Sequence, residues 1–408
     1  MMSASVLNKV VSLISNVLVT RLLSVQEYGL WSFVQNQYSY LVLISGFGLL
    51  SGAFQFGTEN RNQKEEFEYY SYCLKNGLLI NSVLLLICFI LSFWMDFSLE
   101  GVQGYLRVYL PILLLEYILN LLLTVLRCEN RISEYARILN LNTVLIALGT
   151  CVGALWGITG IIVGKYLSYL FSIAQVVKKT RTESKKIKAA QRIRWPQTRS
   201  LWHYSLFVGA SSAMNCLIHL MDISMIANLI KDPILVAVYK VATIIPVALS
   251  FIPNSIVVAL LPNIVQNRNN IPWLKKNIKK MFLGMGLFNL VLCCGLYLFA
   301  PIVIAVMSGK QYLSAVPIFR ILMAGYFFEG TFRLLSTNIL AGLRCVNYGL
   351  FVSITSAVID IVFNLMLIPN YEMAGAAYAS LGAMVVSALL AFGYLIWMIY
   401  GKERKKEC

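Results

Sequence analysis

Apolar runs of about 20 residues recur along the chain, and they limit its fold more than any other feature. One of them includes NSVLLLICFILSFW at 81–94. A helix needs about 20 apolar residues to cross a hydrocarbon core of roughly 30 Å, whereas a transmembrane β-strand shows alternating segments of about ten. Charged residues make up 13% of the chain, against roughly 25% in soluble domains. The sequence therefore predicts an all-α polytopic membrane protein.

Twelve spans are predicted from the positions of these runs. The first run has no basic region before it and no small-residue cleavage site, so we interpret it as a span and not as a cleaved signal. The spans are approximately 4–22, 28–50, 74–95, 105–126, 138–156, 158–177, 203–229, 234–261, 280–299, 315–341, 346–368 and 374–400.

Basic residues are distributed unevenly between the two predicted sides of the membrane. Of the 34 Lys and Arg residues, 25 fall in the even-numbered connections and the C-terminal tail, and about four fall on the opposite side. Cytoplasmic loops carry such an excess. We therefore expect both termini in the cytoplasm, and we attribute the net charge of +16 to topology and not to a nucleic-acid partner.

A long basic segment divides the chain into two halves of six spans each. We interpret it as a cytoplasmic linker that touches anionic lipid headgroups. The expected parts are an N-terminal six-helix lobe at 1–177, the linker at 178–202, a C-terminal six-helix lobe at 203–400 and a cytoplasmic tail at 401–408.

The two halves resemble each other in the spacing of two turns. Tyr28 opens a span and Gly160 lies in a tight turn 132 residues later, while Tyr239 and Gly375 stand 136 residues apart in the second half. Two six-helix halves have the same orientation in the membrane. Parallel repeats of this kind are a transporter architecture, with the substrate site between the halves.

Polar residues follow one face of the first helix of each half. Lys9 and Asn16 belong to this stripe in the first span, and Asn215, His219 and Asp222 belong to it in the seventh. Polar groups in hydrocarbon need partners or water. We interpret both stripes as the lining of a hydrated cavity; hydrogen bonds between packed helices are the alternative.

Further ionisable residues lie near the middle of predicted spans. Glu116, Lys165 and Asp360 are of this kind, and each is either a functional group or half of a structural ion pair. Asp222, with His219 one turn earlier on the same face, could carry a coupling proton. The candidate ion-coupling residues are Glu116, His219, Asp222 and Asp360.

The stretch FRILMAGYFFEGTFRLLSTNILAG carries three charges within one predicted span. Arg333 follows Glu329 by four residues, so the two share a helix face and can pair. Arg320 faces half a turn away and lies near the predicted outer end, where its side chain can reach the interface. A buried arginine suits an anionic cargo, because its planar fork matches phosphate oxygens.

Enzyme and metal motifs are absent from the sequence. It contains no P-loop, no GxSxG, no HExxH and no Rossmann fingerprint, and its nine cysteines show no metal-ligand spacing. We therefore expect neither an enzyme nor a metal site, and no cofactor beyond a coupled proton or cation.

Several segments resemble the polysaccharide-biosynthesis flippases of the Wzx type. These are TRLLSVQEYGLWSF, VAVYKVATIIPVALSFIPNSIVVALLPNI, GKQYLSAVPIFRILMAGYFFEGTFRLLSTNILAGLR and NLMLIPNYEMAGAAYASL. The resemblance implies membership of the multidrug/oligosaccharidyl-lipid/polysaccharide (MOP) exporter superfamily. It implies a MATE-like fold of two lobes forming a V. It also implies a central cavity in which the candidate cations are Lys9, Arg21, Lys165 and Arg333.

The function implied by this resemblance is transport of a lipid-linked glycan. Such flippases move an oligosaccharide repeat unit on undecaprenyl pyrophosphate across the bacterial inner membrane by alternating access, for O-antigen or capsular polysaccharide. The implied partners are membrane lipids and the polymerase and chain-length proteins of the pathway. Candidate substrate-binding residues are Lys9, Asn16, Arg21, Lys165, Asn215, Glu329 and Arg333.

Two other functions remain open at the level of sequence. The first is a drug/cation antiporter of the related MATE branch, whose cavity would be dominated by acidic and aromatic groups. The second is a membrane-embedded polymerase or ligase, which usually has a large periplasmic loop. The longest predicted outer loop here, around DFSLEGVQGYLR, has about a dozen residues.

Overall fold

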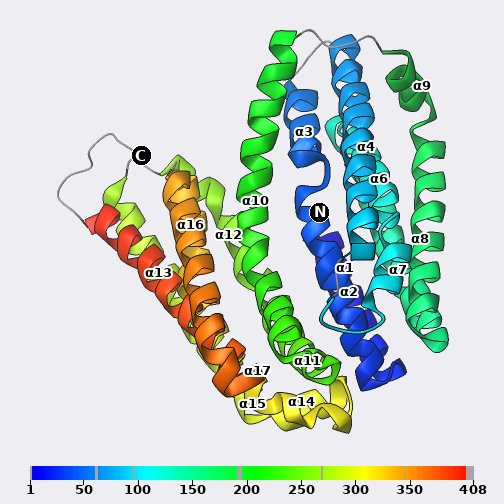
Figure 1. Cartoon of the computed structure of the whole chain (residues 1–408). Helices are drawn as coiled ribbons and strands as arrows, with labels where there is room; N and C mark the ends of the chain where they lie inside the picture. Colours follow the sequence, from blue (N-terminus) through cyan, green and yellow to red (C-terminus); the bar gives the residue numbers. More distant parts are fainter. Residues whose placement is uncertain are drawn as a thin grey trace. The chain divides into compact units, whose positions relative to one another are not determined.

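The computed structural model describes residues 2–59, 63–94, 97–190, 195–267, 270–343 and 345–400. These residues form helices joined by short turns, and no strand occurs among them (Figure 1). The chain divides into two compact units, Met1–Cys216 and Leu217–Cys408, with the boundary inside one long helix. Each unit is described by itself below.

The first unit is a bundle of long helices that run side by side (Figure 1). Its buried residues are mostly Leu, Ile, Val, Tyr and Phe. The elements are α1 (Met2–Leu22), α2 (Val25–Ile44), η1 (Ser45–Gly48), α3 (Leu49–Glu59), α4 (Gln63–Trp94), α5 (Val102–Tyr109), α6 (Ile112–Cys128), α7 (Ile132–Gly153), η2 (Ala154–Trp156), α8 (Gly157–Lys179), α9 (Arg181–Ala189) and the first part of α10 (Trp195–Ile230).

Local sequence signals explain where α2 begins. Ser24 is its N-cap residue, and the Ser24 hydroxyl accepts a hydrogen bond from the Glu27 backbone N–H at 3.2 Å. The Glu27 carboxylate accepts in return from the Ser24 backbone N–H at 3.2 Å. This reciprocal capping box satisfies two of the helix's free donors. It ends the turn after α1 and places the following aromatic residues on α2.

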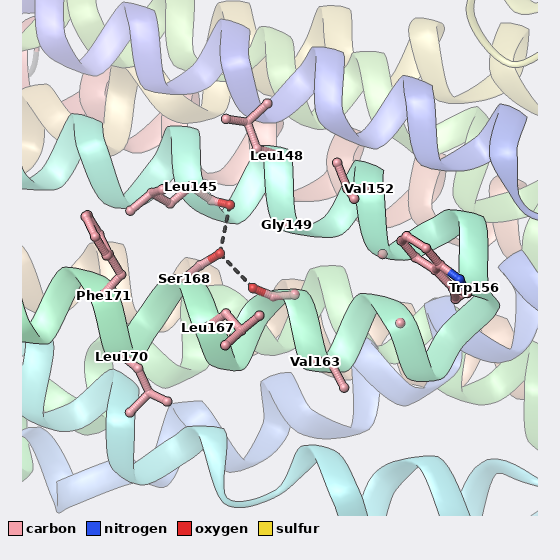
Figure 2. Close-up of a pocket in the computed structure, with 13 residues that line it drawn as sticks. Leu145, Leu148, Gly149, Val152, Trp156, Val163, Leu167, Ser168, Leu170 and Phe171 are labelled. Carbon is pink, nitrogen blue, oxygen red and sulfur yellow. Dashed lines mark hydrogen bonds between the residues drawn. The ribbon is translucent and has the colours of Figure 1, made fainter.

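Glycines bring α7 and α8 into close contact along their length. Gly149 and Gly153 on α7 face Gly160 and Gly164 on α8, and a Cβ atom on Gly149 would lie 2.6 Å from the Gly164 carbonyl oxygen. Figure 2 shows the Ser168 hydroxyl donating to the Leu145 carbonyl across this interface, at 2.8 Å. Small residues at four-residue spacing allow such approach between membrane helices.

The side of the α7–α8 pair drawn in Figure 2 is hollowed into an apolar groove of about 850 Å³. Leu148, Val152, Trp156, Val163 and Leu167 are among its lining residues, and all five are exposed. An exposed apolar surface of this kind is stable against lipid chains and not against water. The groove therefore belongs to the lipid-facing surface of the first unit.

The connection between α6 and α7 is linked to α9 by charged contacts. Arg131 lies 2.9 Å from Glu134, 3.0 Å from Glu183 on α9 and 3.4 Å from Glu129. On the same helix, Ile187 is buried in the core of the first unit. Burial and the charge of Glu183 raise the pKa of Glu129, and Arg131 partly offsets them. These contacts fold part of the basic segment onto the first unit.

The second unit continues from α10. A π-helical turn, η4, joins α15 to α16, and α17 is divided by Glu372, which has a positive φ of 49°. The elements are α11 (Pro233–Leu249), α12 (Phe251–Gln266), α13 (Ile271–Leu298), α14 (Ala300–Met307), η3 (Lys310–Ala315), α15 (Val316–Phe328), η4 (Glu329–Arg333), α16 (Leu334–Gly342) and α17 (Val346–Tyr400).

Side chains hold the irregular points of the second unit. Asp232 caps α11, because its carboxylate accepts from the Ile234 backbone N–H at 2.8 Å and Pro233 occupies the first helical position. The break between α11 and α12 leaves the Leu249 carbonyl available, and the Tyr326 hydroxyl donates to it at 2.9 Å. Tyr326 therefore anchors α15 to this break, one turn before η4 begins.

The predicted spans agree well with the observed helices. Within the described residues, each of the twelve predicted ranges falls on one helix or on consecutive helical segments, and the all-α polytopic fold is confirmed. Eight helical segments are long and apolar enough to cross a membrane. The chain is therefore a multi-pass membrane protein. The predicted lobe boundaries around 178–202 stay predictions, but this segment contains α9 and the start of α10.

Candidate functional site

A polar cavity of about 200 Å³ lies in the first unit where α1, α2, α7 and α8 meet. We call it the first-unit pocket. Ser12 and Asn16 at its edge are exposed, whereas Tyr28 and Trp31 are buried. The lining residues are Ser12, Ser15, Asn16, Val19, Tyr28, Trp31, Gln35, Thr143, Ile146, Ala147, Thr150 and Lys165. Eight of these twelve carry a hydroxyl, amide or ammonium group, so the pocket suits a polar ligand.

Lys165 provides the positive charge of this pocket. Its ammonium group donates to the Tyr109 hydroxyl at 2.6 Å and lies 4.9 Å from the centre of the Trp31 ring. Within the described part of the chain, no carboxylate lies within ion-pair distance of it. A lysine held by a phenol and an aromatic face keeps its charge available for an anionic ligand.

Glu116 belongs to the same group of contacts as Lys165, through Tyr38 and Tyr109. The Tyr38 hydroxyl donates to the Glu116 carboxylate at 2.6 Å, and the rings of Tyr38 and Tyr109 lie 4.4 Å apart. Sequence reasoning placed Lys165 in the cavity and Glu116 among the ion-coupling residues. The structure joins them into one network, with the tyrosines between the two charges.

The other cationic candidates of the first unit lie outside the pocket. Lys9 is exposed on α1, two turns before Asn16, which does line the pocket. Arg21 is exposed in the last turn of α1. Their roles as cavity cations therefore stay predictions.

In the second unit, Asp222 on α10 accepts three hydrogen bonds. The donors are the Tyr239 hydroxyl at 2.6 Å, the Ser380 hydroxyl at 2.5 Å and the Asn364 amide at 3.0 Å. The two helical parts of α17 supply Asn364 and Ser380, and α11 supplies Tyr239. Asp222 is 7% exposed. Donors from three helical segments therefore satisfy the hydrogen-bonding capacity of a buried carboxylate.

Asp360 lies one turn before Asn364 and is not satisfied in this way. It is 1% exposed, and neither of its carboxylate oxygens has a hydrogen-bond partner among the described residues. The side-chain oxygen of Asn364 is also without one there. An isolated buried carboxylate is costly unless a proton or cation neutralises it. Together with Asp222, these oxygens are the donor type that a hard cation prefers.

Two candidates on α10 cannot be placed at the level of side chains. Asn215 and His219 belong to the helix, but their side chains lie outside the part of the chain that the structure describes. Their assignments to the cavity and to ion coupling stay predictions.

The Glu329–Arg333 pair forms as the sequence spacing predicted. A guanidinium nitrogen of Arg333 lies 2.7 Å from the Glu329 carboxylate, and each residue is 6% exposed. The helix there is not a regular α-helix, because both residues belong to the π-helical turn η4. Asn289 on α13 donates to Thr331 inside this turn at 3.0 Å. Such turns are frequent at functional sites.

Arg333 retains unused donors in this arrangement. Among the described residues, Glu329 is the single hydrogen-bond partner of its side chain, which carries five N–H groups. The pair is therefore close to neutral but still able to bind a further anion. Arg320, by contrast, lies against the Tyr297 ring at 5.2 Å and donates to the Tyr297 carbonyl.

One protein-family model matches the sequence of this chain. The model of the family described as polysaccharide biosynthesis protein matches residues 1–268. An uncharacterized membrane protein of Methanocaldococcus jannaschii, MJ1068, is 29% identical over 127 residues. That alignment covers 31% of this chain and 23% of the archaeal protein, so it spans about a quarter of that relative.

Solved structures share the fold over nearly the whole chain. The lipid II flippase MurJ in an inward closed conformation has a TM-score of 0.77 at 15% identity and covers 98% of this chain and 87% of its own. An inward-facing multidrug resistance MATE transporter of the MOP superfamily has a TM-score of 0.75 at 13% identity. The alignment covers 98% of this chain and 96% of that transporter.

A further similar structure comes from Pyrococcus furiosus. This MOP superfamily transporter, described by the reverse polarity of its binding pocket, has a TM-score of 0.62 at 15% identity and covers 98% of this chain and 94% of its own. The similar structures are transporters and flippases. The chain thus shares its fold with flippases and transporters of the MOP superfamily.

Proposed function

Because the chain belongs to the polysaccharide biosynthesis protein family, we propose that it is a flippase for lipid-linked oligosaccharide repeat units. The carrier would be undecaprenyl pyrophosphate, and the glycan would serve O-antigen or capsular polysaccharide synthesis. The protein would act in the bacterial inner membrane by alternating access. The positive-inside distribution of its basic residues supports cytoplasmic termini.

The observation that carries this proposal is that the membrane-embedded cations Lys165 and Arg333 have unused binding capacity. Lys165 has no carboxylate partner among the described residues, and Arg333 uses one acceptor only. Cations in the membrane interior are costly and mark functional sites. A pyrophosphate-linked glycan supplies the anionic and polar groups that such side chains bind.

Ion coupling is proposed for the buried carboxylates of the second unit. Asp360 has no hydrogen-bond partner among the described residues, and Asn364, one helical turn after it, donates to Asp222. A proton or a metal cation would neutralise this pair. Loading and release of the ion would then bias the protein between two conformations.

The proposal is tested by complementation of a strain that lacks the gene. Lys165→Ala and Arg333→Ala are expected to abolish surface polymer while membrane levels of the protein stay near those of the wild type. Arg320→Ala is the control, because Arg320 lies against the Tyr297 ring and donates to the Tyr297 carbonyl, outside both sites. Full polymer yield from both test variants at native protein levels would reject the proposal.

A drug/cation antiporter of the MATE branch is the second candidate. Two observations favour it: the similarity to a MATE transporter and the burial of Asp222 and Asp360 in the second unit. Under this function, deletion of the gene would increase sensitivity to cationic drugs and leave surface polysaccharide unchanged. Under the flippase function, deletion would remove the polymer and leave drug sensitivity unchanged.

A further inference from the structure

The first-unit pocket combines three kinds of groups. Tyr28 and Trp31 contribute aromatic surface, Lys165 contributes one positive charge, and hydroxyl and amide groups line the rest. The side chains of Ser12 and Asn16 have no partner among the described residues. Polar side chains of this kind, aimed at a cavity in a membrane protein, require water or a ligand.

We propose that the first-unit pocket is a subsite for a single acidic sugar residue of the cargo, with the sugar carboxylate bound to Lys165. This inference rests on the proposed flippase function and adds a specificity determinant to it. The pocket binds one sugar residue of the repeat unit, while the remainder of the glycan and the lipid carrier bind elsewhere.

The size of the cavity sets the size of the ligand. A volume of about 200 Å³ corresponds to roughly seven water molecules at liquid density. One pyranose ring with its substituents fills such a space, whereas an oligosaccharide or a drug-sized molecule needs roughly 300 Å³ or more. The pocket therefore holds one ring and excludes a second.

The lining also matches the two surfaces of a sugar ring. A pyranose has an apolar C–H face, which packs on an aromatic side chain, and hydroxyl groups on its rim, which need donors and acceptors. Tyr28 and Trp31 supply the aromatic lining, and the Lys165 ammonium lies over the Trp31 ring, 4.9 Å from its centre. Asn16, exposed at the edge of the pocket, supplies an amide that can both donate and accept hydrogen bonds.

The charge of the pocket favours a carboxylate over a pyrophosphate. Lys165 is its single basic residue, and it acts as a point charge. The negative charge of Glu116, which contacts Tyr38 next to Tyr109, lowers the positive potential at Lys165. A pyrophosphate carries more than one negative charge and is better matched by an arginine fork such as that of Arg333. A monovalent sugar acid leaves the pocket close to neutral.

The test uses the purified full-length protein in nanodiscs, with free sugars as probes. Sodium glucuronate, glucose and sodium pyrophosphate are titrated at constant ionic strength, and binding is followed by the thermal unfolding midpoint and by tryptophan fluorescence. We expect glucuronate to bind at least fivefold more tightly than glucose. Lys165→Gln is expected to remove this preference, and Lys240→Gln is expected to preserve it.

A second variant covers the case in which Lys165→Gln fails to fold. Asn16 is exposed on α1, so Asn16→Ala is expected to fold and to weaken glucuronate and glucose alike. Equal binding of the two sugars to the wild type would overturn the proposal, and so would an absence of saturable binding. Tighter binding of pyrophosphate at this pocket would assign it to the carrier instead. Each of these results is independent of polymer export, which tests the flippase function itself.

Discussion

The Glu329–Arg333 pair offers a perturbation whose two consequences can be separated. Replacing Arg333 by methionine removes the one ion-pair partner that Glu329, which is 6% exposed, has among the described residues. Breaking a buried pair from one side costs roughly 3–5 kcal/mol, because the remaining charge is buried alone. We therefore expect Arg333→Met to lower the thermal unfolding midpoint by at least about 5 °C.

The double variant Glu329→Gln/Arg333→Met removes that uncompensated charge. Replacement of both partners is often neutral for stability, so we expect its unfolding midpoint within about 2 °C of the wild type. If Arg333 binds cargo, polymer export stays absent in the double variant although the protein is stable. Both readouts are measured in one strain, by fluorescence-detected size exclusion and by surface polymer. Export at the wild-type level from the stable double variant would refute a cargo role for Arg333.

Three further predictions follow from single contacts. Asp360→Asn is expected to abolish the stabilisation of the protein by the coupling cation, about 2.7 kcal/mol when the cation is at 100 times its Kd. An unchanged salt-dependent unfolding midpoint would exclude a cation site there. Gly149→Ala is expected to cost roughly 1–3 kcal/mol, because its Cβ would lie 2.6 Å from a backbone oxygen of α8, whereas Gly284→Ala has no atom within 4 Å and serves as the control. Equal unfolding midpoints for the two glycine variants would contradict the close packing of α7 and α8. Burial raises the pKa of Glu129 above its ordinary value near 4.5, so its contribution to stability is present below that value and is lost as pH rises through the folded pKa. Glu129→Gln should therefore lose less stability than the wild type as the pH rises above 4.5 in thermal unfolding, and an identical pH profile would contradict the raised pKa.

Hydropathy and charge predicted the helices because the membrane imposes a single strong constraint on each segment. Every backbone group in hydrocarbon must be bonded within its own helix, so an apolar run of sufficient length has only one outcome. Local signals set the ends, as Ser24 and Glu27 do for α2 and Asp232 does for α11. The spacing of Glu329 and Arg333 predicted their ion pair for the same reason, since both lie on one segment.

The sites were only partly predictable, because their contacts join residues far apart in sequence. The Lys165–Tyr109 bond spans 56 positions and the Ser380–Asp222 bond spans 158. A tyrosine or serine in an apolar run carries no signal of such a partner, so Tyr109 and Ser380 were not candidates. Asp222 itself was found, because an aspartate in a membrane helix stands out in any sequence.

The irregular helices were missed for a different reason. A π-helical turn adds one residue to a helix without changing its composition, so η4 is invisible in the hydropathy of 315–341. The docking of α9 depends on Arg131, which joins two segments 52 residues apart in sequence. The basic composition of α9 predicts a linker that touches anionic lipid headgroups, and Ile187, the one buried side chain among those of α9 that the structure describes, is too weak a signal to indicate a packed helix.

Under the proposed flippase function, the charges of the proposed sites account for a transport cycle. In that proposal Lys165 and Arg333 bind the anionic cargo, and Asp222 with Asp360 binds the coupling cation. In a membrane that is negative inside, each charge moved is worth about 2.3 kcal/mol per 100 mV. Outward movement of an anionic headgroup and inward movement of a cation are then both favourable. Separate sites for cargo and cation allow one protein to use both movements. The cargo drives the outward conformational change, and the cation drives the return of the protein after the cargo has left.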